Sequence, residues 1–172
     1  MMRRLEQIKK ENELLLKKIV SERICQIVEN VYRDTKIGQG LKDRIESLRG
    51  DREGYIYISY LRSSFITRSN EFEILFCNGQ PFVEENDESF YYSLNLLFGD
   101  IETDLKMLEF QLKKGFIRIT SGEIEEIRRL YMEWLFKDCK YVFIAMLKGW
   151  EQKKIKVYYG EYMGEFENIA LE

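Results

Sequence analysis

The sequence contains no histidine, one proline and three cysteines in 172 residues. Histidine changes charge near neutral pH and is the commonest metal ligand, so its absence excludes Ser-His-Asp and Cys-His catalysis, histidine-ligated zinc and iron, and histidine phosphorelay. The missing C-x-x-C pair excludes paired-cysteine zinc knuckles and thioredoxin-like redox motifs. Cys25, Cys77 and Cys139 each lie in an apolar periodic segment, and we expect all three to be buried and reduced.

Long hydrophobic runs and phosphate-binding loops are also missing. The longest uninterrupted apolar run covers residues 141–147, whereas a membrane helix needs about 18 such residues. Charged residues interrupt the segment after Arg3 and Arg4, which leaves no apolar stretch of the signal-peptide kind. Neither G-x-x-x-x-G-K-[ST] nor a strand followed by G-x-G-x-x-G occurs. We therefore expect a cytoplasmic protein and predict no cofactor.

Charge and aromatic residues are distributed unevenly along the chain. Residues 1–53 carry a net charge of +3 and one aromatic residue, whereas residues 54–172 carry −6 and the other 23 aromatics. The composition changes near residues 50–54. We therefore divide the chain into an N-terminal helical segment, 1–50, and an α+β domain, 51–172, which we expect to form one continuous unit with the helix packed on it.

The N-terminal segment has the periodicity of a long helix. Apolar residues recur at steps of three and four, which predicts a helix from about residue 3 to 35 that ends before Gly38 and Gly40, followed by a short helix over 41–48. The stripe consists of Leu5, Ile8, Leu15, Leu16, Ile19, Val20, Ile24, Ile27, Val28 and Val31. Two interpretations are open: the stripe packs along its own domain, or it forms the seam of a homodimer. Asn12 and Glu22 interrupt the heptads that such a seam requires.

The remaining sequence predicts an alternation of strands and helices. Dense β-branched and aromatic residues predict strands over 55–61, 71–77, 82–84, 116–120, 140–147 and 155–159. The run over 55–61 is apolar on both faces, which predicts a central strand. A continuous apolar face predicts a helix over 90–114, and a capping box at Thr120–Glu123 predicts the start of another over 121–137. The expected fold is α+β: a mostly antiparallel sheet of about five strands packed against two or three helices, with a long N-terminal helix.

Two aspartates are the candidates for a metal site. Asp100 and Asp104 lie one helical turn apart in the predicted 90–114 helix and could share a magnesium ion. The apolar stripe of that helix runs through Leu97, Ile101 and Leu105, which directs both carboxylates toward the side or the solvent face. A solvated acidic surface is therefore the preferred interpretation.

The composition favours protein recognition over catalysis. Tyr, Trp and Arg supply much of the binding energy at interfaces, and acidic surfaces attract basic partners. The candidate partner-binding residues are Tyr55, Tyr57, Arg62, Arg68, Glu84, Glu85, Asp87 and Glu88. We expect a small acidic intracellular recognition module, such as an immunity-type inhibitor of a basic toxin or an oligomeric adaptor.

Two alternatives remain open at this point. One is an enzyme that uses carboxylate, tyrosine or lysine chemistry. The other is nucleic-acid binding through the basic N-terminal helix, because lysines and arginines neutralise phosphates. Residues 114–119 resemble the start of an RNA-recognition-motif strand, whose aromatic residues stack on bases. The order of the predicted elements does not fit that motif.

Overall fold

The computed structural model describes residues 2–67, 69–78, 88–99, 101–150 and 155–169. Helices and strands are mixed along the chain, as an α+β fold requires. In order, the elements are α1 (Met2–Arg33), α2 (Thr35–Arg49), β1 (Gly54–Tyr60), α3 (Arg62–Thr67), β2 (Glu71–Cys77), β3 (Glu88–Ser93), α4 (Ile101–Gly115), α5 (Ser121–Asp138), α6 (Lys140–Leu147), β4 (Ile155–Glu161) and β5 (Phe166–Asn168).

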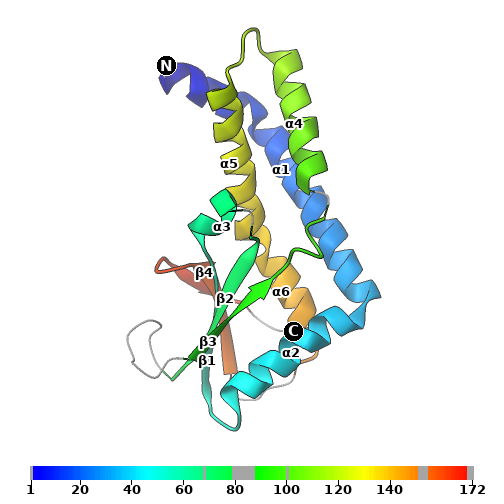
Figure 1. Cartoon of the computed structure of the whole chain (residues 1–172), viewed down its shortest axis with the longest axis vertical. Coiled ribbons are helices and arrows are strands. Elements are labelled where there is room, and N and C mark those ends of the chain that lie inside the picture. Colours follow the sequence, from blue (N-terminus) through cyan, green and yellow to red (C-terminus); the bar gives the residue numbers. More distant parts are fainter. Residues whose placement is uncertain (1, 68, 79–87, 100, 151–154, 170–172) are drawn as a thin grey trace.

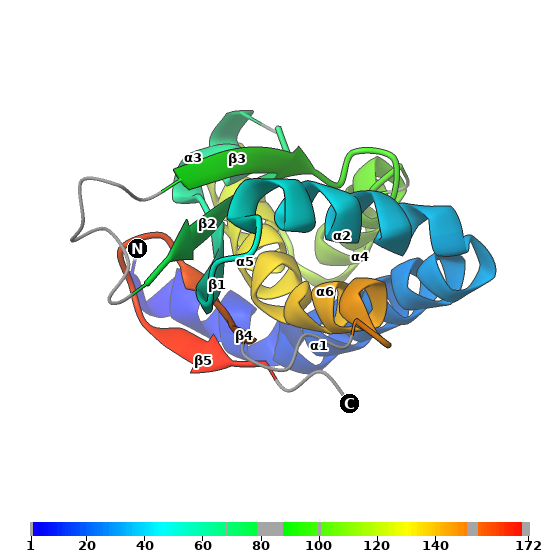
Figure 2. The same ribbon diagram turned by 90° about the horizontal axis from the view of Figure 1, so that it is seen from below.

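The five strands form one mixed sheet that is mostly antiparallel, which confirms the predicted fold class. The strand order is β3-β2-β1-β4-β5, and only the β1–β4 pair is parallel. Figure 2 shows the strands in this order, with the larger helices to one side of them. The apolar residues on both faces of β1 indicated a central strand, and β1 is the middle strand of the sheet.

The helices cover one face of the sheet. Side chains alternate along each strand, so Phe72 of β2 and Tyr159 of β4 point to the helical side together with their alternate neighbours. The ring of Phe72 stacks on Phe136 of α5, with centroids 5.2 Å apart, and meets Phe143 of α6 edge-on at 5.0 Å. These interlocking aromatic rings join the sheet to α5 and α6.

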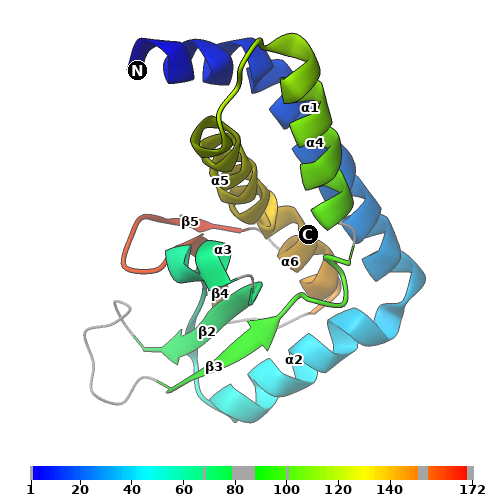
Figure 3. The same cartoon turned by 45° about the horizontal axis from the view of Figure 1, so that its top comes forward.

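The apolar stripe of α1 packs within its own chain. Leu16 and Ile27 are almost completely buried in the core that α1 shares with α5 and α6. The chain changes direction after α1 at Asp34, which is the N-cap residue of α2. The Asp34 side chain accepts a hydrogen bond from the Lys36 N–H. Figures 1 and 3 show α1 running beside α4 and turning sharply into α2. Residues from 1–50 and from 51–172 therefore contribute to a single hydrophobic core.

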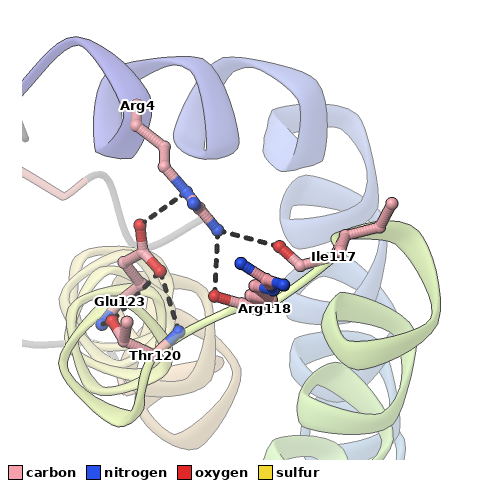
Figure 4. Close-up of polar contacts among 5 residues, drawn as sticks. All are labelled: Arg4, Ile117, Arg118, Thr120 and Glu123. Atoms are coloured by element: carbon pink, nitrogen blue, oxygen red, sulfur yellow. Dashed lines mark hydrogen bonds and ion pairs between the residues drawn. The ribbon is translucent and has the colours of Figure 1, made fainter.

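An arginine near the start of α1 connects this helix to the beginning of α5. Arg4 pairs with Glu123 at 3.0 Å and donates to the backbone carbonyls of Ile117 and Arg118, each at 3.1 Å. Figure 4 shows these contacts. Glu123 also accepts a hydrogen bond from the Thr120 N–H at 2.8 Å, and the Thr120 hydroxyl accepts one from the Glu123 N–H. The predicted capping box is thus confirmed, and the N–H of Thr120 lowers the pKa of Glu123.

Three predicted elements were wrong. The first part of the predicted 90–114 helix is strand β3, and the helix begins only at Ile101. The predicted strand 116–120, which resembled part of an RNA-recognition motif, is the connection between α4 and α5, where Arg118 has a positive φ. Residues 140–147 form helix α6 because an apolar run buried on all sides suits a core helix as well as a strand.

Smaller corrections concern the second helix and the cysteines. Helix α2 begins at Thr35 and includes Gly38 and Gly40, which were expected to end the first helix. Cys77 and Cys139 are buried as predicted, whereas Cys25 is exposed. The predicted return strand 82–84 lies outside the described residues, and the described partner of β2 on that side is β3.

Candidate functional site

The face of the sheet opposite the helices carries an aromatic cluster. Tyr57, Leu75 and Cys77 are buried there, and Tyr55, Tyr158 and Phe166 pack around them. We call these six residues the sheet-face cluster. They come from β1, β2, β4 and β5, and none of its members belongs to a helix in the described parts of the chain. The alternation of side chains places this cluster opposite the main core.

The rings of the sheet-face cluster contact one another in geometries that aromatic pairs prefer. Tyr57 stacks on Tyr158 with centroids 5.0 Å apart and planes 15° apart, and Phe166 meets Tyr57 edge-on at 5.2 Å. Tyr55 lies 6.4 Å from Tyr57 and 6.1 Å from Tyr158, measured between centroids. Such contacts hold several rings in fixed positions and form an ordered apolar platform with phenol groups on it.

A hollow of about 440 Å³ adjoins the platform at the β4–β5 end of the sheet. Three carboxylates and one lysine give it a negative character, and Phe166 belongs to both the hollow and the platform. We call it the acidic hollow. Its lining residues are Tyr60, Lys137, Tyr159, Gly160, Glu161, Glu165, Phe166 and Glu167.

Gly160 allows the chain to turn back closely at the acidic hollow. A Cβ atom at this position would collide with the backbone carbonyl of Glu165 and would lie 2.9 Å from the ring of Phe166. The strand pairing places Gly160 directly opposite Phe166. The absence of a side chain at Gly160 therefore lets Phe166 lie against β4, where its ring reaches Tyr57.

The charges around the acidic hollow are only partly compensated. Arg62 pairs with Glu161, with Nη2 and Oε2 3.2 Å apart, and Lys140 pairs with Glu167 at 2.8 Å. Burial raises the pKa of Tyr60, and the charges of Glu161 and Glu133 raise it further. In the described part of the chain, no ion pair or hydrogen bond involves the Glu165 carboxylate.

The structure brings some of the predicted partner-binding residues together. Tyr55 and Tyr57 belong to the sheet-face cluster. Arg62 lies beside the acidic hollow because it forms an ion pair with Glu161, which lines the hollow. Glu88 is at the other edge of the sheet, in β3, where it pairs with Arg52 at 2.9 Å. The other candidates lie outside the described residues: Arg68, Glu84, Glu85 and Asp87.

The sequence did not single out Tyr158, Phe166 or the carboxylates of the acidic hollow. The alternation of residues 155–159 could have indicated that Tyr158 lies on the face opposite Val157 and Tyr159. Phe166 lies in residues 162–172, whose sequence has too little pattern to predict a helix or a strand. Its position becomes evident only from the pairing of β5 with β4.

Asp104 does not have the solvated environment that was expected. It is buried in α4 and forms an ion pair with Arg23 of α1, and the Tyr131 hydroxyl donates a hydrogen bond to it at 2.6 Å. Asp100 lies outside the described residues. Among the residues that the structure describes, no group of three or more cysteine, aspartate or glutamate side chains could hold a metal ion.

A second hollow of about 350 Å³ lies between α4 and α5. Its charged residues are largely paired: Arg128 with Glu109 at 2.7 Å and Arg129 with Glu126 at 3.0 Å. Its lining residues are Asn70, Phe98, Gly99, Ile101, Glu102, Leu105, Glu125, Glu126, Arg128, Arg129 and Met132. The hydrogen bond from Arg129 lowers the pKa of Glu126, so this carboxylate stays ionised and is unsuited to proton transfer near neutral pH.

A scan against protein-family models, a search of curated proteins and a search of solved structures each find no match to this chain. Within the described ranges, no helix combines the length and the apolar character that crossing a bilayer requires. The function is therefore inferred from the chemistry of the surface itself. The sheet-face cluster and the acidic hollow share Phe166 at the β4–β5 edge of the sheet. The rings of the cluster lie on the face that the helices leave uncovered, whereas Glu161 and Glu167 of the hollow are opposite Tyr60 and Tyr159 and so lie toward the helical side of that edge.

Proposed function

We propose that this protein is an intracellular recognition module that binds a basic protein through its sheet-face cluster and acidic hollow. The observation that carries the proposal is the contiguity of the two features: Phe166 packs edge-on against Tyr57 and also lines the acidic hollow. A partner that sits on the aromatic rings and reaches around the β4–β5 edge would therefore place basic side chains among Glu161, Glu165 and Glu167.

The aromatic part supplies apolar contact area at low entropic cost. Tyrosine has few rotatable bonds, and the rings of Tyr57, Tyr158 and Phe166 already hold one another in place. Ordered aromatic residues near the centre of an interface often contribute most of its binding energy. Tyr55 and Tyr158 remain partly exposed and are available for contact.

The acidic part supplies selectivity for a basic partner. Residues 54–172 carry a net charge of −6, and the carboxylates of the acidic hollow are concentrated beside the platform. Complementary charge accelerates association and disfavours acidic partners. An immunity-type inhibitor of a basic toxin and an adaptor for a basic protein both fit this description. The three free cysteines suit a reducing compartment such as the cytoplasm.

Retention of partners from a lysate of the source cells tests the proposal. The immobilised wild-type protein is compared with a double variant, Tyr55→Ala with Tyr158→Ala, and with a control, Tyr32→Ala with Tyr141→Ala. Tyr32 and Tyr141 are exposed residues of α1 and α6, away from the sheet-face cluster. We expect a basic protein to be retained by the wild type and the control, lost from the double variant, and released by high salt.

Two results would contradict the proposal. One is equal retention of the same proteins by the wild type and the double variant. The other is a retained protein that is acidic or that stays bound when the salt concentration is raised. Circular dichroism of the double variant establishes that the sheet remains folded, so that a loss of binding can be assigned to the surface.

A further inference from the structure

A glutamate lies in the middle of the uncovered sheet face, beyond the sheet-face cluster. Glu73 of β2 is directly opposite Ser59 of β1 on one side and Tyr91 of β3 on the other. Directly opposed side chains of neighbouring strands lie close enough to contact each other. The alternation of β2 places Glu73 on the same face as Leu75 and Cys77, which belong to the sheet-face cluster.

The carboxylate of Glu73 is buried and incompletely satisfied. The residue is only 9% exposed. Its Oε2 atom is buried, and among the residues described by the structure none donates a hydrogen bond to it. A buried charge without a partner is costly, so such groups are normally paired with an opposite charge. Glu73 therefore has the capacity to bind a cation that reaches it from the uncovered side of the sheet.

Two exposed tyrosines accompany Glu73 on this face. Tyr91 is 55% exposed and Tyr162 is 40% exposed. Tyr162 directly follows β4, and its N–H donates to the Tyr60 carbonyl at 3.0 Å, which holds the backbone of Tyr162 beside the end of β1. The charge of Glu73 raises the pKa of the Tyr91 hydroxyl, and burial, Tyr162 and Glu71 raise it further, which agrees with the closeness of these groups.

We infer that Glu73, Tyr91 and Tyr162 form an anchor site for an arginine side chain of the basic protein partner. This inference rests on the proposed function and adds the chemical group that the partner inserts. A guanidinium group can stack on an aromatic ring while its edge donates hydrogen bonds to a carboxylate. The exposed rings of Tyr91 and Tyr162 and the unsatisfied oxygen of Glu73 provide these two kinds of contact on one face.

A short peptide with two arginines between glycines is the probe for this site. Its counterpart contains citrulline, which has nearly the same size and hydrogen-bonding groups but no charge, and a third peptide contains lysine. Binding is followed by NMR of protein with labelled tyrosine rings, assigned by single substitutions. We expect the arginine peptide to shift the ring signals of Tyr91 and Tyr162 in a saturable manner, the lysine peptide to bind more weakly and the citrulline peptide to have no effect.

Substitution of Glu73 is the main test. Glu73→Gln keeps the shape of the side chain and removes its charge, and we expect it to raise the Kd for the arginine peptide about tenfold. Tyr91→Leu, at an exposed position, removes one ring and should weaken binding in the same direction. The control is Glu13→Gln, an equal change of charge in α1, where Glu13 pairs with Lys17 away from the sheet; its Kd should stay within about twofold of the wild type.

Three results would overturn the inference: no shift of the Tyr91 signal by the arginine peptide, equally tight binding to Glu73→Gln and to the wild type, or equally tight binding of the citrulline peptide. If Glu73→Gln does not fold, Tyr91→Leu decides the question alone. Retention of the basic partner by both the wild type and Glu73→Gln would contradict the anchor site and leave the proposed function standing. Failure of the wild type to retain any basic protein, with arginine binding intact, would contradict the proposed function alone.

Discussion

Arg23 of α1 and Asp104 of α4 form a two-point ion pair: the Nε and Nη2 atoms of the arginine each lie 2.7 Å from one carboxylate oxygen. The Arg23 side chain is 11% exposed and the Asp104 side chain 10%. Tyr131 of α5 donates its hydroxyl to the same carboxylate. The three side chains therefore connect α1, α4 and α5, the helices that extend beyond the sheet (Figure 1).

Asp104→Asn should destabilise the protein strongly, because it leaves the Arg23 charge buried without its partner. Breaking a buried ion pair from one side typically costs about 3 kcal/mol or more. Urea unfolding monitored by circular dichroism measures the difference. Glu13→Gln, which removes an exposed partner of Lys17, should leave the midpoint unchanged within error. An equal midpoint for Asp104→Asn and the wild type would show that the pair does not hold the three helices together.

Stability should also fall at high pH. Burial raises the pKa of Tyr131 and of Tyr159, and the charge of Asp104 adds to the effect on Tyr131. In the unfolded chain a tyrosine titrates near pH 10, so above that pH the folded state binds more protons than the unfolded state. The contribution of each buried tyrosine to the free energy of unfolding is complete below about pH 10. Above that pH it decreases by about 1.4 kcal/mol per pH unit.

Unfolding at several pH values between 9 and 11 measures this dependence, with tyrosinate absorbance as a second signal. Tyr131→Phe should reduce the slope above pH 10, because the phenylalanine has no proton to lose. Tyr32→Phe, at an exposed position of α1, should leave the slope unchanged. A slope that is the same in Tyr131→Phe and the wild type would contradict the assignment.

Two glycines of α2 provide a matched pair for the packing of this helix on α6. A Cβ atom at Gly38 would lie 2.5 Å from the backbone carbonyl oxygen of Met146, whereas a Cβ atom at Gly40 meets nothing within 4 Å. Gly38→Ala should therefore destabilise the protein by about 1–3 kcal/mol. Gly40→Ala should stabilise it by about 0.5–1 kcal/mol through helix propensity alone. Thermal and urea unfolding test both; a Gly38→Ala variant as stable as Gly40→Ala would show that α2 and α6 are less close than described.

Much of the fold could be predicted because periodicity marks long amphipathic elements. The stripe of α1 and the capping box of α5 gave these helices correctly, and the dense apolar run at 55–61 identified the central strand. Residues 90–97 were mistaken for helix because Phe90, Leu94 and Leu97 follow helical spacing by coincidence. Phe90 and Tyr92 instead alternate as a strand beside β2, and that pairing is a tertiary contact.

The candidate site was less accessible to prediction because it is assembled from distant parts of the chain. The sequence suggested Tyr57 as a candidate partner-binding residue, but its neighbours Tyr158 and Phe166 follow it by about a hundred residues. The parallel pairing of β1 with β4 brings Tyr158 to Tyr57, and the pairing of β5 with β4 adds Phe166. The sequence pattern marks each strand separately and contains no direct signal for this pairing or its register.

The central claim is that the uncovered sheet face is the surface that touches a basic protein. The most direct measurement places a photo-crosslinking amino acid at Tyr158 in the source cells and compares it with the same group at Tyr141 of α6, an exposed position outside the sheet face. We predict that the Tyr158 position crosslinks to a basic protein, that added salt before irradiation of the lysate suppresses the product, and that the Tyr141 position does not form it. The same product from both positions, or none from Tyr158, would contradict the claim.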